Sequence, residues 1–165
     1  MSQGGRVALE FALRHPGRVA GLILQGTPLG GFQPGPRGED AIPLAAYARL
    51  VKDGRLAEMK ALWRRHPLMR DARDEALLAA YDGRDLLAPT GPSPPLAEAL
   101  GEIDAPTLVV TGQQEIAWLQ LGGDAIAYGL PNARRIRLPG GHLCNISHPG
   151  PYNEMVAAFD AGIGR

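Results

Sequence analysis

Residues 2–24 read SQGGRVALEFALRHPGRVAGLIL, and this stretch decides the fold. Apolar residues recur at helical spacing through residues 4–14, with charged residues on the opposite side. The segment 15–17, His-Pro-Gly, ends that helix. The apolar run 19–24 then fits a buried strand better than a helix, because it is short and is followed by Gly26. Helix, tight turn and buried strand make half of a βαβ unit, so the stretch predicts an α/β protein.

The later part of the chain supplies more elements of the same kind. A short apolar run predicts a second strand at residues 105–112, and alternation of polar and apolar residues predicts a third at residues 133–138. Helical spacing predicts helices over residues 96–100, 117–129 and 149–163. We therefore expect about three parallel strands flanked by helices.

A block of helical segments without strands interrupts this pattern. Residues 41–53, 55–65 and 72–81 each show helical spacing, and the Pro/Gly-rich segments 28–38 and 88–95 enclose them. Proline-rich joints around a helical block are typical of an inserted subdomain. The sequence thus predicts a core formed by residues 1–36 and 96–165, with a helical lid at residues 37–95.

Composition excludes several classes of partner and cofactor. The 165 residues carry 17 basic and 17 acidic side chains, so no basic field is available for nucleic acid or an anionic membrane. The single cysteine, Cys144, permits neither an internal disulfide nor a cysteine metal cluster. We find no flavin or nicotinamide fingerprint, and we expect no cofactor and no metal. Without a visible signal peptide or an apolar run of about 20 residues, we expect a cytoplasmic protein.

Three polar side chains stand at the ends of three predicted elements. Ser2 opens the first helix, Glu115 follows the second strand, and His142 follows the third. The carboxyl ends of parallel strands meet at one edge of a sheet, so we expect these residues to lie together. Ser2 would attack a carbonyl, His142 would take its proton, and Glu115 would orient the imidazole. The plainer alternatives are a helix N-cap for Ser2, a solvated loop carboxylate for Glu115 and a surface histidine for His142.

These segments resemble the α/β-hydrolase superfamily. The start of the chain, SQGGRVAL, resembles the nucleophile elbow G-x-S-x-G and its helix, and residues 15–24 resemble the lead into the next strand. Residues 105–112 resemble the strand before the acid, and residues 139–142, PGGH, resemble the segment that presents the histidine. The resemblance is nearest to lid-bearing esterases, lactonases and haloperoxidase-like members. It implies a serine hydrolase of an ester, lactone or amide, with a triad of Ser2, Glu115 and His142 and the backbone N–H of Gln3 in the oxyanion hole.

The chain departs from the family pattern in two respects. The family usually has Asp where this chain has Glu115, and Asp124 is the nearest substitute. The N-terminal half of the family's fold, with its second oxyanion donor, precedes the point where this sequence starts. The apolar strand 19–24 would then have an open edge, so we expect it to contact either that missing half or a second copy of the chain.

The aromatic residues and the overall function leave alternatives open. Phe32, Tyr47 and Trp63 could line an apolar acyl pocket, although helical spacing also fits ordinary core packing. The chain could be an inactive hydrolase remnant that acts as a self-associating or binding module. It could also expose Ser2 as a true N-terminal nucleophile after removal of Met1, with its own α-amine as base.

Overall fold

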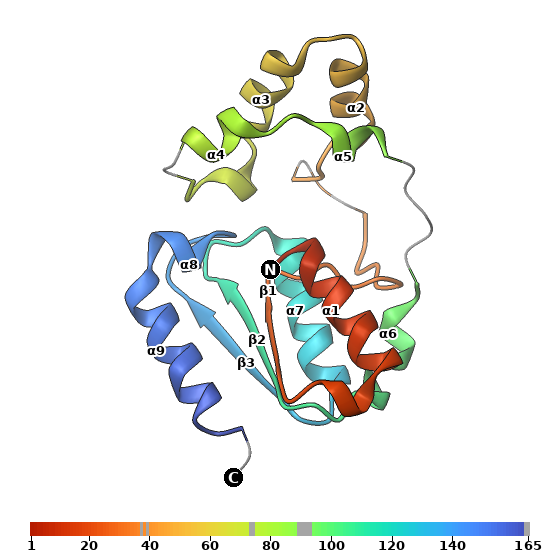
Figure 1. The fold of residues 1–165 in the computed structure, drawn as a ribbon, viewed down its shortest axis with the longest axis vertical. Coiled ribbons are helices and arrows are strands. Elements are labelled where there is room, and N and C mark those ends of the chain that lie inside the picture. Colours follow the sequence, from red (N-terminus) through yellow and green to blue (C-terminus); the bar gives the residue numbers. More distant parts are fainter. Residues whose placement is uncertain (37, 39, 73–74, 89–93, 164–165) are drawn as a thin grey trace.

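The centre of the molecule is a three-stranded parallel sheet. The computed structural model describes residues 1–36, 38, 40–72, 75–88 and 94–163. The strands are β1 (Leu22–Gln25), β2 (Thr107–Gly112) and β3 (Ala133–Leu138), in the order β1-β2-β3 (Figure 1). All three predicted strands are confirmed. β2 lies in the middle and is buried throughout, while β1 and β3 are the edges.

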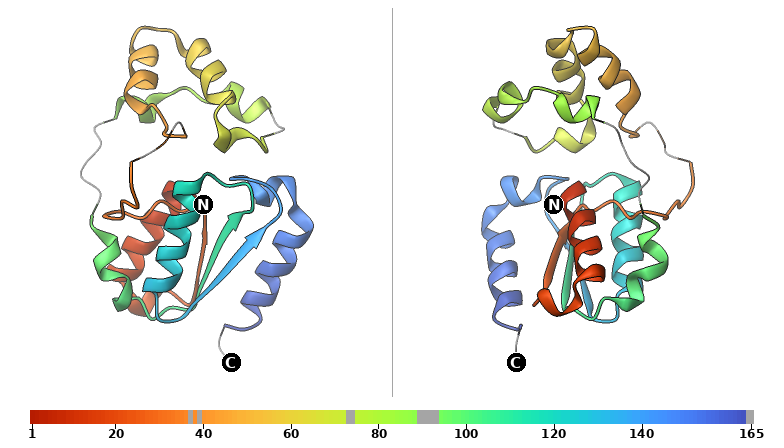
Figure 2. Two further views of the ribbon diagram at one scale, coloured as in Figure 1. Left: turned by 180° about the vertical axis from the view of Figure 1, so that it is seen from behind. Right: turned by 45° about the vertical axis from the view of Figure 1, so that its right-hand side comes forward.

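Helices cover both faces of the sheet. One face carries α1 (Gln3–Arg14), α6 (Leu96–Ala99) and α7 (Ala117–Gly129), and the other carries α8 (Cys144–Ser147) and α9 (Pro149–Asp160) (Figures 1 and 2). The short 3₁₀ helices η1 (Pro16–Arg18) and η3 (Leu100–Glu102) precede β1 and β2. Among the described residues, no helix is long and apolar enough to span a membrane.

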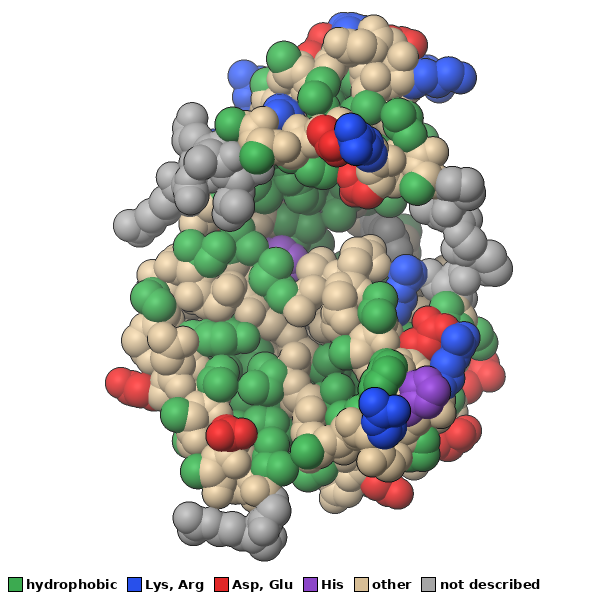
Figure 3. All heavy atoms as spheres, viewed as in Figure 1, with side chains coloured by type: hydrophobic (Ala, Val, Ile, Leu, Met, Phe, Trp, Pro, Cys, Tyr) green, Lys and Arg blue, Asp and Glu red, His purple; other side chains and the backbone are tan. Residues whose placement is uncertain are grey.

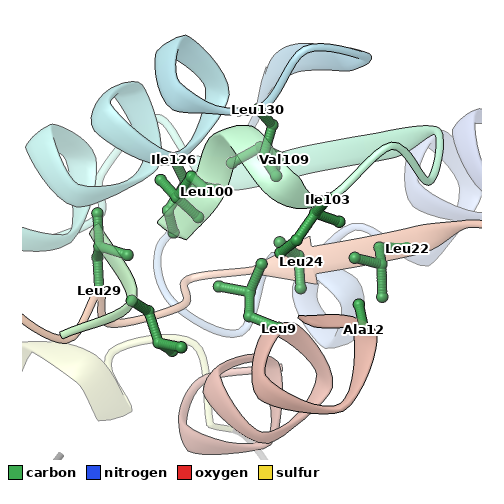
Figure 4. Packing of buried hydrophobic residues seen from close by; sticks show 11 residues of the cluster. Leu9, Ala12, Leu22, Leu24, Leu29, Leu100, Ile103, Val109, Ile126 and Leu130 are labelled. Atoms are coloured by element: carbon green, nitrogen blue, oxygen red, sulfur yellow. The ribbon is translucent and has the colours of Figure 1, made fainter. Parts of the chain in front are cut away.

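Two hydrophobic clusters follow from the two-residue period of the strands. Val109 of β2 packs toward α1, α6 and α7 together with Leu24 and Ile126 (Figure 4). Its neighbours Leu108 and Val110 point the other way, into a cluster with residues of α8 and α9. Alternation along a fully buried strand thus supplies both cores.

The apolar stripe of α1 is narrower than the sequence suggests. Leu9 and Ala12 are buried, but Val7 is 62% exposed and Phe11 is 43% exposed. Helix α1 lies over the edge strand β1 and contacts α6, so only the face toward these two elements finds a partner. Val7 and Phe11 share the helical spacing of residues 4–14 but lie outside the buried face of α1.

A separate helical layer lies above the carboxyl edge of the sheet (Figure 1). It contains α2 (Leu44–Lys52), α3 (Leu56–Arg64), η2 (Pro67–Met69), α4 (Glu75–Ala80) and α5 (Arg84–Leu87). We call its described residues, from 40 to 88, the lid. The domain boundaries at 36/37 and 95/96 stay predictions, since residues 37, 39 and 89–93 lie outside the described part.

Candidate active site

Ser2 has a strained backbone. Its φ of 48° and ψ of −128° make it the one non-glycine residue with a positive φ in the described part of the chain. Such a conformation costs roughly 1–3 kcal/mol and persists only where surrounding contacts impose it. Here the Ser2 N–H donates to the Gln25 carbonyl at 2.8 Å, and the Gly5 N–H donates to the Ser2 carbonyl at 2.9 Å. These bonds tie Ser2 to the end of β1 and to the first turn of α1.

The close approach of α1 to the exit of β1 requires a glycine at position 5. A Cβ on Gly5 would lie 1.9 Å from Oγ1 of Thr27, which is itself buried. A Cβ on Gly4 would meet nothing within 4 Å. Both glycines belong to the motif seen in the sequence, but only Gly5 is required by packing in this chain.

Glu115 and His142 form a buried pair. Oε2 of Glu115 lies 2.7 Å from Nδ1 of His142, and the two residues are 8% and 6% exposed. The other carboxylate oxygen, Oε1, accepts from the Ile116 N–H at 3.0 Å. An acceptor at Nδ1 assigns the proton of a neutral ring to Nδ1, and this leaves Nε2 as a hydrogen-bond acceptor. An imidazole held in this way can take a proton at Nε2.

Asp124, the substitute acid considered above, lies elsewhere. Its carboxylate contacts Arg135 at 2.9 Å and Arg137 at 2.8 Å, which joins α7 to β3. Its oxygens therefore neutralise strand side chains, and Glu115 is the carboxylate at the imidazole.

The end of β1 links Ser2 to the His142 loop. The buried side chain of Gln25 donates from Nε2 to the His142 carbonyl at 2.9 Å and to Oδ1 of Asn145 at 2.8 Å. A Cβ on Gly26 would lie 2.7 Å from the His142 ring. Ser2 and His142 thus both contact the segment Gln25–Gly26. Our sequence analysis missed Gln25, although a polar residue closing an apolar strand was a visible signal.

A pocket of about 260 Å³ opens beside Ser2. Ser2 and Gln3 form one side of it, and apolar residues of the lid and of the start of α7 form much of the rest, among them Ile42, Leu68 and Trp118. Asp40 brings a carboxylate to the wall. Figure 3 shows the hollow between lid and body, with hydrophobic side chains on its upper wall. The pocket therefore combines the Ser2 hydroxyl with a mostly apolar chamber.

The aromatic residues predicted for the pocket lie elsewhere. Tyr47 and Trp63 pack edge to face within the lid, with ring centroids 6.0 Å apart. Phe32 packs against the cluster of α1, α6 and α7. The structure brings none of the three to the pocket beside Ser2, because Tyr47 and Trp63 pack within the lid and Phe32, in a loop, packs against the core.

His66 is a second buried histidine near this site. Its Nδ1 accepts from the Leu68 N–H at 3.2 Å, and its ring stacks on Trp63 at 5.0 Å. Burial lowers the pKa of His66, and the neighbouring His142 acts in the same direction, while the carbonyl and charge of Asp40 oppose the shift. The ring is therefore held neutral beneath the lid helices.

We expect this histidine to make the protein lose stability on acidification. The unfolded state binds the proton near pH 6.5, before the folded state does, so the free energy of unfolding falls as pH drops from about 6.5 through the lowered pKa of His66. In His66→Asn the side chain can still accept from the Leu68 N–H, but it no longer titrates. Melting temperatures between pH 7.5 and pH 5 should fall more steeply for the wild type than for His66→Asn. Parallel curves for the two proteins would contradict this assignment.

No protein-family model matches the chain. Curated relatives include the 2-hydroxy-6-oxononadienedioate/2-hydroxy-6-oxononatrienedioate hydrolase of Cupriavidus pinatubonensis, 31% identical over 96% of this chain and 59% of its own length. The 2-hydroxy-6-oxononadienedioate/2-hydroxy-6-oxononatrienedioate hydrolase 2 of Pseudomonas putida is 27% identical over 96% of this chain and 60% of its own length. The chain thus spans about 60% of the length of these relatives.

Solved structures share the fold over nearly the whole chain. MenH from S. aureus matches with a TM-score of 0.78 and 22% identity, covering 100% of this chain and 67% of that structure. An enol-lactonase from Burkholderia xenovorans LB400 matches with a TM-score of 0.73 and 20% identity, covering 98% of this chain and 64% of that structure. With its parallel sheet flanked by helices, the chain therefore has the α/β-hydrolase fold and carries the C-terminal part of it.

Proposed function

We propose that this chain carries the catalytic triad of a serine hydrolase, with Ser2 as nucleophile, His142 as general base and Glu115 as the orienting acid. The observation that carries the proposal is the buried contact of 2.7 Å between Glu115 and Nδ1 of His142. The strained turn at Ser2 and the pocket beside it support the same assignment. The curated relatives described above are named as hydrolases, which agrees with this reaction class.

The proposed reaction has two halves. Oγ of Ser2 attacks the substrate carbonyl while its proton passes to Nε2 of His142, and the imidazolium then gives that proton to the departing alcohol or amine. Water then attacks the acyl-serine carbonyl while His142 takes its proton, and the imidazolium returns that proton to Oγ of Ser2 as the acid leaves. The Gln3 N–H, in the first turn of α1, has no partner within its helix and would donate to the oxyanion.

The pocket points to a small, largely apolar acyl group. Its volume of about 260 Å³ lies just below the range of roughly 300–1,000 Å³ that holds drug-sized ligands. The apolar wall formed by Ile42, Leu68 and Trp118 would bind the acyl chain of an ester, lactone or amide. The relatives' names also denote small-molecule substrates.

We propose that the open edge of β1 receives a strand from the N-terminal part of the α/β-hydrolase fold. The Ser2 N–H already bonds to Gln25 on that edge, so a residue joined before Ser2 would lie alongside β1. A groove between β1 and α9, lined by Val19, Ile23 and Val156 among others, borders this edge, and hydrophobic side chains gather over this part of the body in Figure 3. The added half would also bring the second oxyanion donor, whose loss typically costs on the order of 10²–10³ in rate.

Self-association of the isolated chain through residues 19–24 remains a prediction. An apolar edge without a partner strand is a template for pairing with another copy. Sedimentation velocity should show a concentration-dependent oligomer, and Ala20→Lys should weaken it by placing a charge on an exposed residue of the groove. Ala79→Lys, on an exposed lid residue, is the matched control. A monomer at all concentrations would contradict the prediction.

The triad is tested by covalent labelling with a fluorophosphonate, which reacts with activated serines. The intact chain should gain one adduct, and peptide mass spectrometry should locate it at Ser2. Ser2→Ala should remain unlabelled, whereas Ser147→Ala, which changes a serine in α8, should react like the wild type. No adduct at Ser2 in the wild-type chain, either alone or mixed with an N-terminal half, would overturn the proposal.

A further inference from the structure

We propose that Asp71 of the lid is a positioning residue for His142, so that the docked lid sets the geometry of the candidate base. The catalytic meaning of this inference rests on the proposed function, but the structural contact does not. Asp71 comes shortly after η2 and is only 9% exposed. Its Oδ2 accepts from the Gly141 N–H, and Gly141 directly precedes His142. A lid carboxylate thus holds the backbone on which the imidazole stands.

Three side chains support the His142 loop, and they come from different layers. Glu115 holds the ring at Nδ1, and Gln25 holds the carbonyl of His142. Both belong to the carboxyl edge of the sheet and stay in place wherever the lid lies. Asp71 is the support that comes from the lid, so it alone among these three would be withdrawn if the lid moved.

The negative charge of Asp71 acts on the buried Cys144 next to the His142 loop. Burial raises the pKa of the Cys144 thiol to about 11, and the negative charges of Glu115 and Asp71 add to this effect. Cys144 lies two residues beyond His142 and is fully buried. The two carboxylates therefore act on the same small region, one from the sheet and one from the lid. A buried hydrogen bond to a charged acceptor is worth more than a neutral one, which suits a role in fixing a loop.

The same lid turn lines the substrate pocket. Leu68 of η2 belongs to the pocket wall beside Ser2, and Asp71 follows it by three residues. The His66 ring accepts from the Leu68 N–H and so stiffens this turn. A molecule bound in the pocket and in contact with Leu68 would therefore contact the same turn whose Asp71 accepts the Gly141 hydrogen bond. One short turn thus contributes both to the pocket wall and to the support of Gly141.

The contact is tested by amide hydrogen exchange of Gly141, followed by NMR on the intact chain. Asp71→Ala should speed this exchange on the order of 10- to 100-fold, because a hydrogen bond to a charged buried acceptor is lost. Asp71→Asn keeps an oxygen acceptor and should stay close to the wild type. Asp53→Ala, which removes an exposed lid carboxylate after α2, is the control. Wild-type protection of Gly141 in Asp71→Ala would overturn the proposal.

The positioning role is tested by the kinetics of Ser2 labelling. In Asp71→Ala the maximal rate should fall about tenfold while the half-saturating concentration of the fluorophosphonate stays the same, and Asp71→Asn should restore most of the rate. An unchanged maximal rate together with faster Gly141 exchange would overturn the positioning role. If the wild type is not labelled at all, the proposed function fails, and the exchange data still decide whether the lid holds the loop. Should Asp71→Ala unfold, Asp71→Leu, which has a side chain of similar size but no acceptor, carries the test: Gly141 exchange should still be faster than in the wild type, and wild-type protection of Gly141 would overturn the proposal.

Discussion

Glu115→Gln should lower the rate of Ser2 labelling by about 10³–10⁴, because it turns the imidazole into the wrong tautomer. Oε1 of Glu115 accepts from the Ile116 N–H, and this bond fixes which end of a replacing amide faces the ring. The amide oxygen of the substituted side chain would keep the Ile116 bond, so its NH₂ group would take the place of Oε2 beside Nδ1 of His142. Nδ1 would then accept, its proton would move to Nε2, and Nε2 could no longer take the proton of Ser2.

The measurement is a single-turnover labelling rate on the intact chain, which does not require rapid turnover. Glu154→Gln is the matched control, because it makes the same chemical change on an exposed position of α9. A Glu115→Gln rate within about threefold of the wild type would show that this carboxylate does not set the tautomer. Glu115→Asp separates length from charge, since the shorter carboxylate keeps its charge but retracts from Nδ1 by one methylene.

The sheet could be predicted from the sequence because local signals specify it. The run 133–138 is bounded by Pro131-Asn132 and Pro139, and β3 occupies the same six residues. The helix predicted over 117–129 also has the same bounds as α7. By contrast, α5 and α8 were not predicted. Each has four residues, about one turn, so the helical period is a weak signal at this length, although α6, equally short, was predicted at 96–100.

Contacts between the layers could not be predicted in this way. The bond between Asp71 and Gly141 joins residues 70 positions apart, and nothing in the sequence around Asp71 distinguishes it from a solvated lid carboxylate. The aromatic residues predicted for the pocket also show that the sequence does not specify contacts between layers. Tyr47 and Trp63 have the period of a helix face, but the period does not reveal whether that face meets the pocket or its own lid. The positions of Ser2, Glu115 and His142 were accessible because each opens a regular element or follows one within a few residues.

Gly112→Ala, at the last residue of β2, should lower the free energy of unfolding by about 3 kcal/mol. A Cβ at this position would lie 2.1 Å from the Gly141 carbonyl oxygen and 2.3 Å from that of Gly140. Both obstacles are backbone atoms, so no rotamer change relieves the clash. The strand exit is tied to the same loop, since the Gln114 N–H donates to the Gly140 carbonyl at 2.8 Å. Relief therefore requires the loop that carries His142 to move.

That movement should reach the chemistry as well as the stability. A displacement of about 1 Å in a positioned group can cost roughly 10² in rate, so Ser2 labelling in Gly112→Ala should fall at least that far even at temperatures where the variant is folded. Gly17→Ala is the control: its Cβ would meet nothing within 4 Å on an exposed residue of η1, and the change should be neutral or stabilise by up to about 1 kcal/mol. Urea unfolding measures the first effect and single-turnover labelling the second. A loss of less than about 0.5 kcal/mol in the free energy of unfolding of Gly112→Ala, or a wild-type labelling rate, would contradict this prediction. The packing of the end of β2 against the His142 loop would then not position the imidazole.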